Sequence, residues 1–237
     1  MVLAPLLPIL HPILKSTFPN CLWQGNTQNP EIALTFDDGP HPEYTPKLLE
    51  VLDKYQIKAN FFLLGICVDR YPEITKAIYQ KGHWISLHGY EHISFPKLTP
   101  IQLKYSLEKT QLSIYKACGL ATNLIPDVRP PNGIVLSQTI KLLKEWGYRT
   151  VMWTVVPVDW VRPGISVVVN RVVQQTSNGS IIVLHDGCYG GQDVVKSVAE
   201  IIIILREKNY KFITIDEMWL RKVKYQQDLR KETRFLQ

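Results

Sequence analysis

The sequence predicts an α/β protein in which about seven parallel strands close into a barrel of the (β/α) type. Two observations support this class. Between residues 31 and 215, apolar segments typical of buried strands alternate with segments that repeat their apolar residues at helical spacing. The chain has 237 residues, 46% of them hydrophobic, and no segment of a second composition class, so it can bury one large core. We therefore expect a single barrel domain.

The elements follow from local signals. The first strand is expected over 31–36, because its apolar run suits burial on both faces and ends at Gly39-Pro40. The longest helix is expected from Thr99-Pro100, a capping residue followed by a proline at the first helical position, to about residue 116, with Gly119 beyond its end. The same criteria predict strands over 58–64, 83–87, 124–129, 148–155, 180–184 and 212–215, helices over 44–55, 72–80, 135–146, 165–176 and 194–208, and a last helix capped by Asp216.

Composition favours one catalytic domain over 31–220, an N-terminal arm over 1–30 that packs on it, and a charged helical tail over 221–237. The first fourteen residues are apolar but contain three prolines and lack a basic start, so they predict neither a clean signal peptide nor a membrane span. Any membrane association is expected to come from a missing upstream anchor.

Charge and cysteines limit the function classes. The net charge of +6 permits contact with an anionic wall polymer, but outside the tail no Arg/Lys cluster alternates with aromatic residues, so we expect no nucleic-acid partner. The four cysteines contain no Cys-x-x-Cys pair. They are expected to be buried apolar residues or to form one disulfide, not to bind zinc.

Two adjacent carboxylates, Asp37 and Asp38, stand where the first strand ends. Within a strand their side chains would point to opposite faces, so they can share a site only where the ladder breaks into a loop, and Gly39 provides that break. His88 and His92 follow another strand at i, i+4 spacing. If that segment makes a helical turn, the two imidazoles and Asp38 could hold one metal ion that keeps open positions. The ordinary alternatives are an Asp-Asp-Gly-Pro turn and a solvated histidine pair.

Other polar residues also follow predicted strands. Arg129 precedes two prolines, which make its segment rigid, and Asp159 and His185 each come just after a strand. Glu91 is an alternative metal ligand. Singly, each could be an ordinary loop or turn residue. Their shared position at strand ends favours one active site, because the ends of parallel strands lie on one rim of a barrel.

The segments 35–40, 88–92, 129–133, 159–160 and 184–186 resemble the five ordered motifs of the polysaccharide deacetylases, carbohydrate esterase family 4, also called the NodB-homology domain. The resemblance covers about residues 31–220. It implies a distorted, TIM-like (β/α) barrel that binds a divalent metal, usually Zn²⁺, with Co²⁺ or Ni²⁺ as alternatives. It also implies removal of acetyl groups from N-acetylglucosamine polymers such as peptidoglycan or chitin. We expect a monomer that acts on an N-acetylated glycan in the cell envelope or another extracytoplasmic location.

The resemblance also implies residue roles. The metal ligands are Asp38, His88 and His92; the proton-transfer group is Asp37, Arg129, Asp159 and His185; the substrate contacts are Pro130, Asn132, Trp160 and Leu184. In this scheme Asp37 is the general base oriented by Arg129, and His185 is the acid held by Asp159. Amide hydrolysis independently requires an activated water, oxyanion stabilisation and an acid for the leaving nitrogen.

Some positions depart from the usual family pattern. Leu87 and Gly89 replace Asn and Ser or Thr beside His88, so a hydrogen bond that supports the metal loop is expected to be missing. Ile93, Asn132 and Val156 also differ from the commonest residues. Because no metal or proton-transfer residue is lost, we expect an active deacetylase. The alternatives are a non-catalytic carbohydrate-binding protein of the same fold and a hydrolase of a small cyclic amide.

Overall fold

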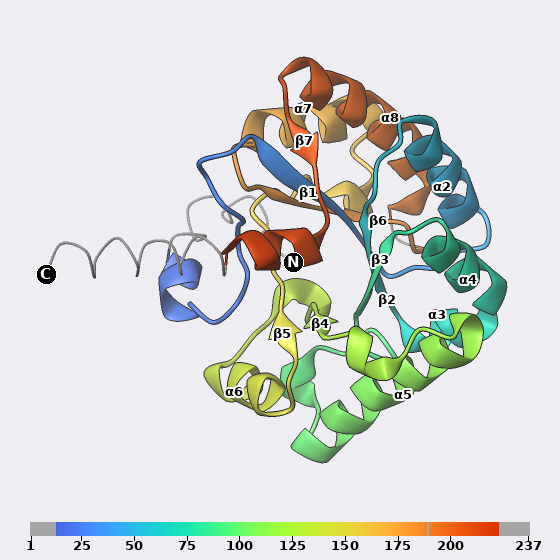
Figure 1. Cartoon of the computed structure of the whole chain (residues 1–237), viewed down its shortest axis with the longest axis vertical. Coiled ribbons are helices and arrows are strands. Elements are labelled where there is room, and N and C mark those ends of the chain that lie inside the picture. Colours follow the sequence, from blue (N-terminus) through green and yellow to red (C-terminus); the bar gives the residue numbers. More distant parts are fainter. Residues whose placement is uncertain (1–12, 189, 223–237) are drawn as a thin grey trace, which may run out of the picture.

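The computed structural model describes residues 13–188 and 190–222. Within these residues, seven strands, all paired in parallel, form one sheet (Figure 1). The spatial order is β5-β4-β3-β2-β1-β6, and β7 pairs with the start of β1. The strands are β1 (Glu31–Asp37), β2 (Asn60–Leu63), β3 (Trp84–Leu87), β4 (Asp127–Val128), β5 (Arg149–Thr150), β6 (Ile181–His185) and β7 (Lys211–Phe212).

The two ends of the sheet meet through the segment that follows β5. Val155 forms an isolated parallel bridge with Ile182 of β6, and the Val183 N–H donates to the Val155 carbonyl at 3.1 Å. The predicted distorted barrel of parallel strands is therefore confirmed. The strand expected over 148–155 is much shorter, because after Thr150 the chain pairs through single bridges and not through a continuous ladder.

Helices surround the sheet (Figure 1). They are α2 (Tyr44–Lys54), α3 (Gly65–Arg70), α4 (Pro72–Gln80), α5 (Pro100–Cys118), α6 (Ser137–Glu145), α7 (Ile165–Gln175) and α8 (Gly191–Glu207), with 3₁₀ turns η2 (Phe95–Lys97), η3 (Thr122–Leu124), η4 (Pro131–Gly133) and η5 (Asp159–Val161). The sequence did not predict α3, because six residues are too few to show helical periodicity. The α5 prediction is confirmed by a capping box between Thr99 and Gln102 and by Gly119 at φ 76°.

The cap of the last helix was predicted wrongly. The helix begins at residue 215, and Thr214 caps it: the Glu217 N–H donates to Thr214 Oγ1 at 3.3 Å, and the Thr214 N–H donates to Glu217 Oε2 at 2.7 Å. Asp216 lies inside the first turn and accepts from Arg149. A cap must precede the helix for its side chain to reach the free N–H groups, so Asp216 is misplaced for that role.

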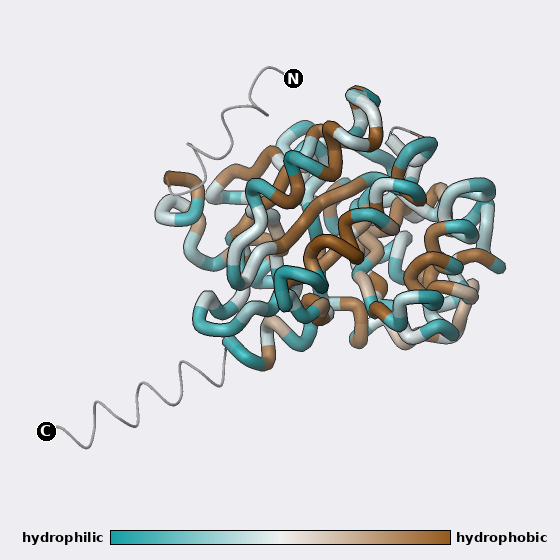
Figure 2. The backbone as a smooth tube through the Cα atoms, turned by 90° about the horizontal axis from the view of Figure 1, so that it is seen from above, coloured by the Kyte–Doolittle hydropathy of each residue, from teal (hydrophilic) through white to brown (hydrophobic). Residues whose placement is uncertain are grey.

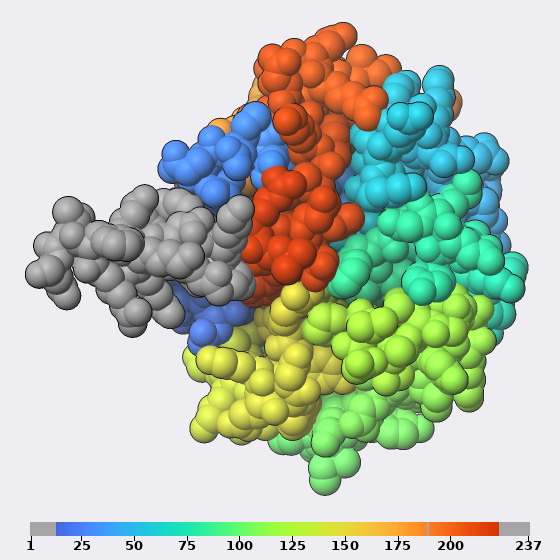
Figure 3. Space-filling view, viewed as in Figure 1, coloured from blue at the N-terminus to red at the C-terminus, as the bar shows by residue number. Residues whose placement is uncertain are grey.

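The alternation of side chains along the strands divides the apolar residues of β1 between two of the three buried apolar clusters. On β1, Leu34 and Phe36 pack in the layer between sheet and helices, whereas Ala33 packs inside the barrel. Met218 of the C-terminal helix joins the inner core, and Figure 3 shows this red segment over the middle of the face in view. Figure 2 shows apolar stretches concentrated in the interior of the trace. The barrel is thus filled by side chains, and its amino-terminal end is covered.

The residues before β1 pack on the barrel as far as they are described. Cys21, Leu22 and Trp23 are buried, Leu22 forms a parallel bridge with Val151, and Trp23 stacks on Trp153 with ring centroids 5.8 Å apart. Residues 1–12 of the expected arm and residues 223–237 of the expected tail lie outside the described residues. The domain boundaries stay a prediction.

The cysteines are free thiols. Cys21 is buried as expected, and burial raises its pKa to about 12, whereas Cys188 is exposed. In the described part of the chain, no helix combines the length and apolar character needed to cross a membrane.

Candidate active site

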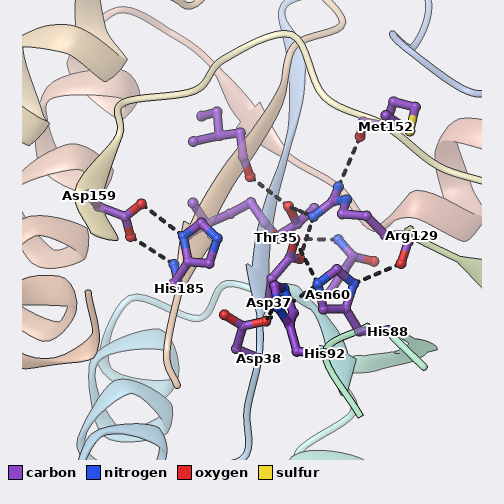
Figure 4. A network of polar contacts seen from close by, with 12 residues as sticks. Thr35, Asp37, Asp38, Asn60, His88, His92, Arg129, Met152, Asp159 and His185 are labelled. Atoms are coloured by element: carbon purple, nitrogen blue, oxygen red, sulfur yellow. Dashed lines mark hydrogen bonds and ion pairs between the residues drawn. The ribbon is translucent and has the colours of Figure 1, made fainter. Parts of the chain in front are cut away.

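Side chains from distant segments gather at the carboxyl-terminal ends of the strands (Figure 4). Asp37 ends β1 and His185 ends β6, and the two residues are register partners. His88 directly follows β3, and Arg129 directly follows β4. Asp159 opens η5, beyond the segment that pairs with β6. The sequence correctly placed these residues at strand ends, and the barrel brings them to one rim.

Asp38, His88 and His92 form a cluster that could hold a metal ion. The Nε2 atoms of both histidines lie 3.4 Å from Asp38 Oδ1, and the three candidate ligand atoms all lie within 4.8 Å of one another. The Nδ1–H of His88 donates to the Arg129 carbonyl at 2.7 Å. That hydrogen bond leaves the Nε2 lone pair of His88 directed at the cluster, as a metal ligand requires.

Two local backbone features build this cluster. Asp38 has φ 73°, a left-handed conformation that turns its side chain away from the direction it would have in the strand. Gly187 passes so close that a Cβ there would lie 2.6 Å from the Asp38 Cβ. Residues 88–92 are an irregular loop and not the helical turn considered from the sequence, yet their two imidazole centroids are 5.3 Å apart.

The donor set fits a divalent ion such as zinc. Asp38 Oδ1 is buried and makes no hydrogen bond to any described residue, so one strong acceptor is left for a cation. Burial lowers the pKa of His88, although Asp37 and Asp38 oppose that shift, so its imidazole is neutral and able to ligate at neutral pH. Two imidazoles and one carboxylate are ligands that zinc accepts while keeping an open position.

Asp37 pairs with Arg129. Arg129 Nη1 donates to Asp37 Oδ1 at 2.6 Å and to Thr35 Oγ1 at 2.8 Å, and Nη2 donates to the Met152 carbonyl at 2.9 Å. Arg129 is 2% exposed, and its guanidinium lies 4.0 Å from the Phe62 ring centroid. Burial lowers the pKa of Arg129, and the charge and hydrogen bond of Asp37 oppose this. The buried charge pair fixes the orientation of the Asp37 carboxylate.

His185 is held by Asp159 through two contacts. Its Nδ1 lies 2.9 Å from Asp159 Oδ1, and its backbone N–H donates to Asp159 Oδ2 at 2.8 Å. Burial by itself lowers the pKa of His185, but the charge and hydrogen bond of Asp159, with added contributions from Asp38 and Asp37, raise it to about 10. The imidazole is therefore protonated at neutral pH. Trp160 packs against it edge to face at 5.1 Å.

The residues expected to touch substrate occupy different environments. Asn132 is exposed in a left-handed conformation (φ 62°), and its Nδ2 donates to Ser94 Oγ at 2.9 Å. Trp160 is partly exposed, whereas Pro130 is buried and Leu184 is fully buried in the core between sheet and helices. The substrate roles of these four residues stay predictions.

The sequence did not identify three residues of the site, which are Thr35, Thr45 and Asp186. Thr35 accepts the second Arg129 hydrogen bond, and Asp186 is fully buried beside the carboxylate loop, accepting from Thr45 Oγ1 at 2.5 Å. Burial raises the pKa of Asp186 to about 7, helped by the charge of Asp38 and opposed by the Thr45 hydrogen bond. The position of Asp186 directly after His185 was the signal that could have identified it.

A sequence model of the family described as polysaccharide deacetylase matches residues 24–151. The chain belongs to the polysaccharide deacetylase family. Family members are hydrolases that cleave carbon–nitrogen bonds of amides, and this chain is an enzyme of that class. The match includes the expected motifs from β1 through Arg129.

Individual polysaccharide deacetylases are similar over most of the chain. A peptidoglycan-N-acetylglucosamine deacetylase of Bacillus cereus is 34% identical over 201 residues, which cover 83% of this chain and 91% of that protein. A chitooligosaccharide deacetylase of Azorhizobium caulinodans is 34% identical over 68% of this chain and 77% of its own length. The structure of Bacillus subtilis PdaA, a family 4 carbohydrate esterase, superposes with a TM-score of 0.81 at 31% identity, covering 88% of this chain and 89% of PdaA.

Proposed function

We propose that this chain is a divalent-metal-dependent N-deacetylase that converts N-acetylglucosamine residues of a peptidoglycan or chitin-like polysaccharide into free amines, releasing acetate. One observation carries the proposal. The Asp38–His88–His92 cluster lies beside the Asp37 carboxylate, which is paired with Arg129, on the same rim as a protonated imidazole, His185. A metal-ligand set, a base and an acid are the groups that amide hydrolysis needs together.

Asp38, His88 and His92 would hold the ion, most simply Zn²⁺, with Co²⁺ or Ni²⁺ as alternatives. When bound, the ion would lower the pKa of a water molecule and polarise the acetyl carbonyl. Asp37 accepts the proton of the attacking water at its carboxylate. Arg129 donates to Oδ1 of Asp37 at 2.6 Å, which fixes the orientation of this carboxylate, while Oδ2 lies on the side of His88, 4.0 Å from Nε2.

His185 donates the proton that the departing nitrogen needs. Because Asp159 occupies Nδ1, the free Nε2–H of the imidazolium is the group available for donation. The base and the acid thus each have a partner of opposite charge, because Arg129 is beside Asp37 and Asp159 is beside His185. Trp160 packs on the His185 ring and limits its movement.

The substrate class and location rest on the relatives. Two of them are named for action on peptidoglycan N-acetylglucosamine and on chitooligosaccharide, so an N-acetylated glycan in the cell envelope is the substrate we propose. The protein's formal net charge of +6 is compatible with an anionic wall polymer. We propose that the enzyme acts as a monomer and needs no nucleic acid.

A direct test uses defined chitin oligomers and purified peptidoglycan. After incubation with zinc-loaded protein, acetate is measured enzymatically and the glycan products are identified by mass spectrometry. Loss of acetyl groups from glucosamine positions, abolished by a chelator and restored by zinc, supports the proposal. Acetate release that survives full chelation would contradict metal dependence. Zinc-loaded protein that releases acetate from none of these glycans would contradict the substrate class.

A further inference from the structure

The two histidines of the metal cluster are held in very different ways. His88 follows β3 directly, its N–H donates to the Leu63 carbonyl at 2.9 Å, its ring bonds to the Arg129 carbonyl, and it is 2% exposed. His92 lies four residues further, in an irregular loop, with a side chain that is 38% exposed. The position of His92 therefore depends on whatever fixes the loop between the two histidines.

Tyr90, midway between them, fixes that loop through three polar groups. Its N–H donates to Ser106 Oγ of α5 at 2.8 Å, and its carbonyl accepts from the Ile66 N–H of α3 at 2.9 Å. Its hydroxyl donates to Asp69 Oδ2 of α3 at 2.9 Å. The preceding residue adds a fourth contact, since the Gly89 carbonyl accepts from the Gly65 N–H at 3.0 Å.

The half-buried Tyr90 ring also makes two close contacts. It lies against Gly65, where a Cβ would come within 2.4 Å of the ring carbon Cδ2, and the Lys109 ammonium lies 3.5 Å from the ring centroid. A cation at this distance from a tyrosine face is attracted to it. Two helices, α3 and α5, thus hold one aromatic side chain whose own backbone leads to His92.

We propose that Tyr90 is a positioning residue for metal binding, and that the clamp of Asp69, Ser106 and Lys109 around it holds His92 in reach of the ion. Without the clamp, the loop would have to be ordered when metal binds, and the cost of ordering would reduce the affinity. Leu87 and Gly89 stand beside His88 where the family pattern has Asn and Ser or Thr, whose hydrogen bond would be expected to support the metal loop. In this chain the clamp supplies that support. This inference rests on the proposed metal-dependent function.

The test measures the zinc affinity of purified protein by competition with a chromogenic chelator. We expect Tyr90→Ala to weaken zinc binding by about 10- to 100-fold, as for other residues that support metal ligands, and Tyr90→Phe to weaken it less, because only the bond to Asp69 is lost. Tyr115 is an exposed tyrosine on α5, the helix that carries Ser106 and Lys109. Tyr115→Ala is the matched control and should bind zinc like the wild type. Thermal unfolding of the metal-free variants shows whether each one folds.

A double-mutant cycle shows whether Tyr90 affects zinc affinity through His92. If Tyr90 acts through His92, Tyr90→Ala should lower the affinity in the wild-type background and change it little in a His92→Ala background. Cu²⁺ binds nitrogen and oxygen ligands more tightly than zinc. The affinity for Cu²⁺ is therefore measured for variants that bind zinc too weakly. An equal loss in both backgrounds, or no loss in Tyr90→Ala, would overturn the inference. A wild-type protein that binds neither ion would overturn both the metal-dependent function and this inference.

Discussion

At the scale of single residues, the site depends on two neighbouring aspartates that have opposite surroundings. Asp37 is in the strand and forms a buried pair with Arg129, whereas Asp38 has left the strand conformation and keeps a buried oxygen without a hydrogen bond. Arg129 binds only Oδ1 of Asp37, so it orients that carboxylate and leaves Oδ2 free to accept a proton, whereas the Asp38 oxygen without a donor is suited to bind a cation. In the proposed mechanism, one peptide bond therefore separates the general base from a metal ligand.

The first prediction separates these two functions. We expect Asp37→Asn to keep bound metal and to lower kcat by about 100- to 10,000-fold, because an amide cannot accept the proton. Asp38→Asn should lose most of the metal, because an amide oxygen is a neutral and weaker ligand. Turnover on a chitin oligomer and zinc content by elemental analysis measure both. Metal loss in Asp37→Asn with metal retained in Asp38→Asn would reverse the assignment.

The second prediction concerns pH. The pKa of His185 is raised to about 10, so the protonated acid is present at neutral pH and is lost only as the pH rises through that value. Asp159→Asn removes the opposing charge, so burial should then lower the pKa of His185. We expect the alkaline limb of kcat/KM to move to lower pH and activity at pH 8 to fall by about tenfold or more. An unchanged alkaline limb would show that Asp159 does not control the acid.

At the scale of elements, loops carry the chemistry and helices support the loops. The long helix α5 contributes Ser106 and Lys109 to the segment between the two metal-cluster histidines, and its start is fixed by a capping box at Thr99. Such a box satisfies N–H groups that have no partner within the helix. The stability of α5 should therefore depend measurably on one hydroxyl group.

The third prediction tests this cap. Thr99→Ala should lower the free energy of unfolding by about 1 kcal/mol, because the hydrogen bond from the Gln102 N–H is lost. Thr99→Ser keeps the acceptor oxygen and should be nearly neutral. Urea unfolding followed by circular dichroism measures the difference. Equal stabilities of the Ala and Ser variants would show that the cap contributes nothing.

At the scale of the whole molecule, the two ends of the barrel have separate tasks. The carboxyl-terminal end holds the site, and the other end is held together around the fully buried Asp127. This carboxylate accepts from Trp84 Nε1 at 2.8 Å, from Trp219 Nε1 at 3.0 Å and from Arg149 at 2.9 and 2.7 Å. It therefore joins β3, β4, β5 and the C-terminal helix.

The fourth prediction tests this division. Asp127→Ala should lower the free energy of unfolding by about 3 kcal/mol, because it leaves two indole N–H groups without their acceptor and leaves the partly buried Arg149 only its contact with Asp216. The kcat/KM of the folded fraction should stay unchanged, since the site lies at the opposite end. Asp53→Ala, which breaks an exposed pair with Lys81, is the control and should not change stability measurably. A large loss of kcat/KM in folded Asp127→Ala would contradict the division.

The sequence by itself determined the order of strands and helices, because burial on both faces and helical periodicity are local properties. It also placed Asp37, His88, Arg129 and His185 at strand ends, since the loop signals follow the strands directly in the chain. It failed where the signal is short or depends on a distant partner. The helix α3 is too short for periodicity, and the last helix begins two residues earlier than expected, so that Thr214 and not Asp216 caps it.

Only the tertiary structure decided which groups meet. The bridge of Val155 to Ile182 closes the barrel, the left-handed turn at Asp38 separates its side chain from that of Asp37, and Tyr90 packs between two helices. Each of these contacts joins segments far apart in the chain or depends on a backbone angle that residue type does not fix. Their energy comes from packing and hydrogen bonds that exist only once the barrel has formed, so no local pattern could predict them.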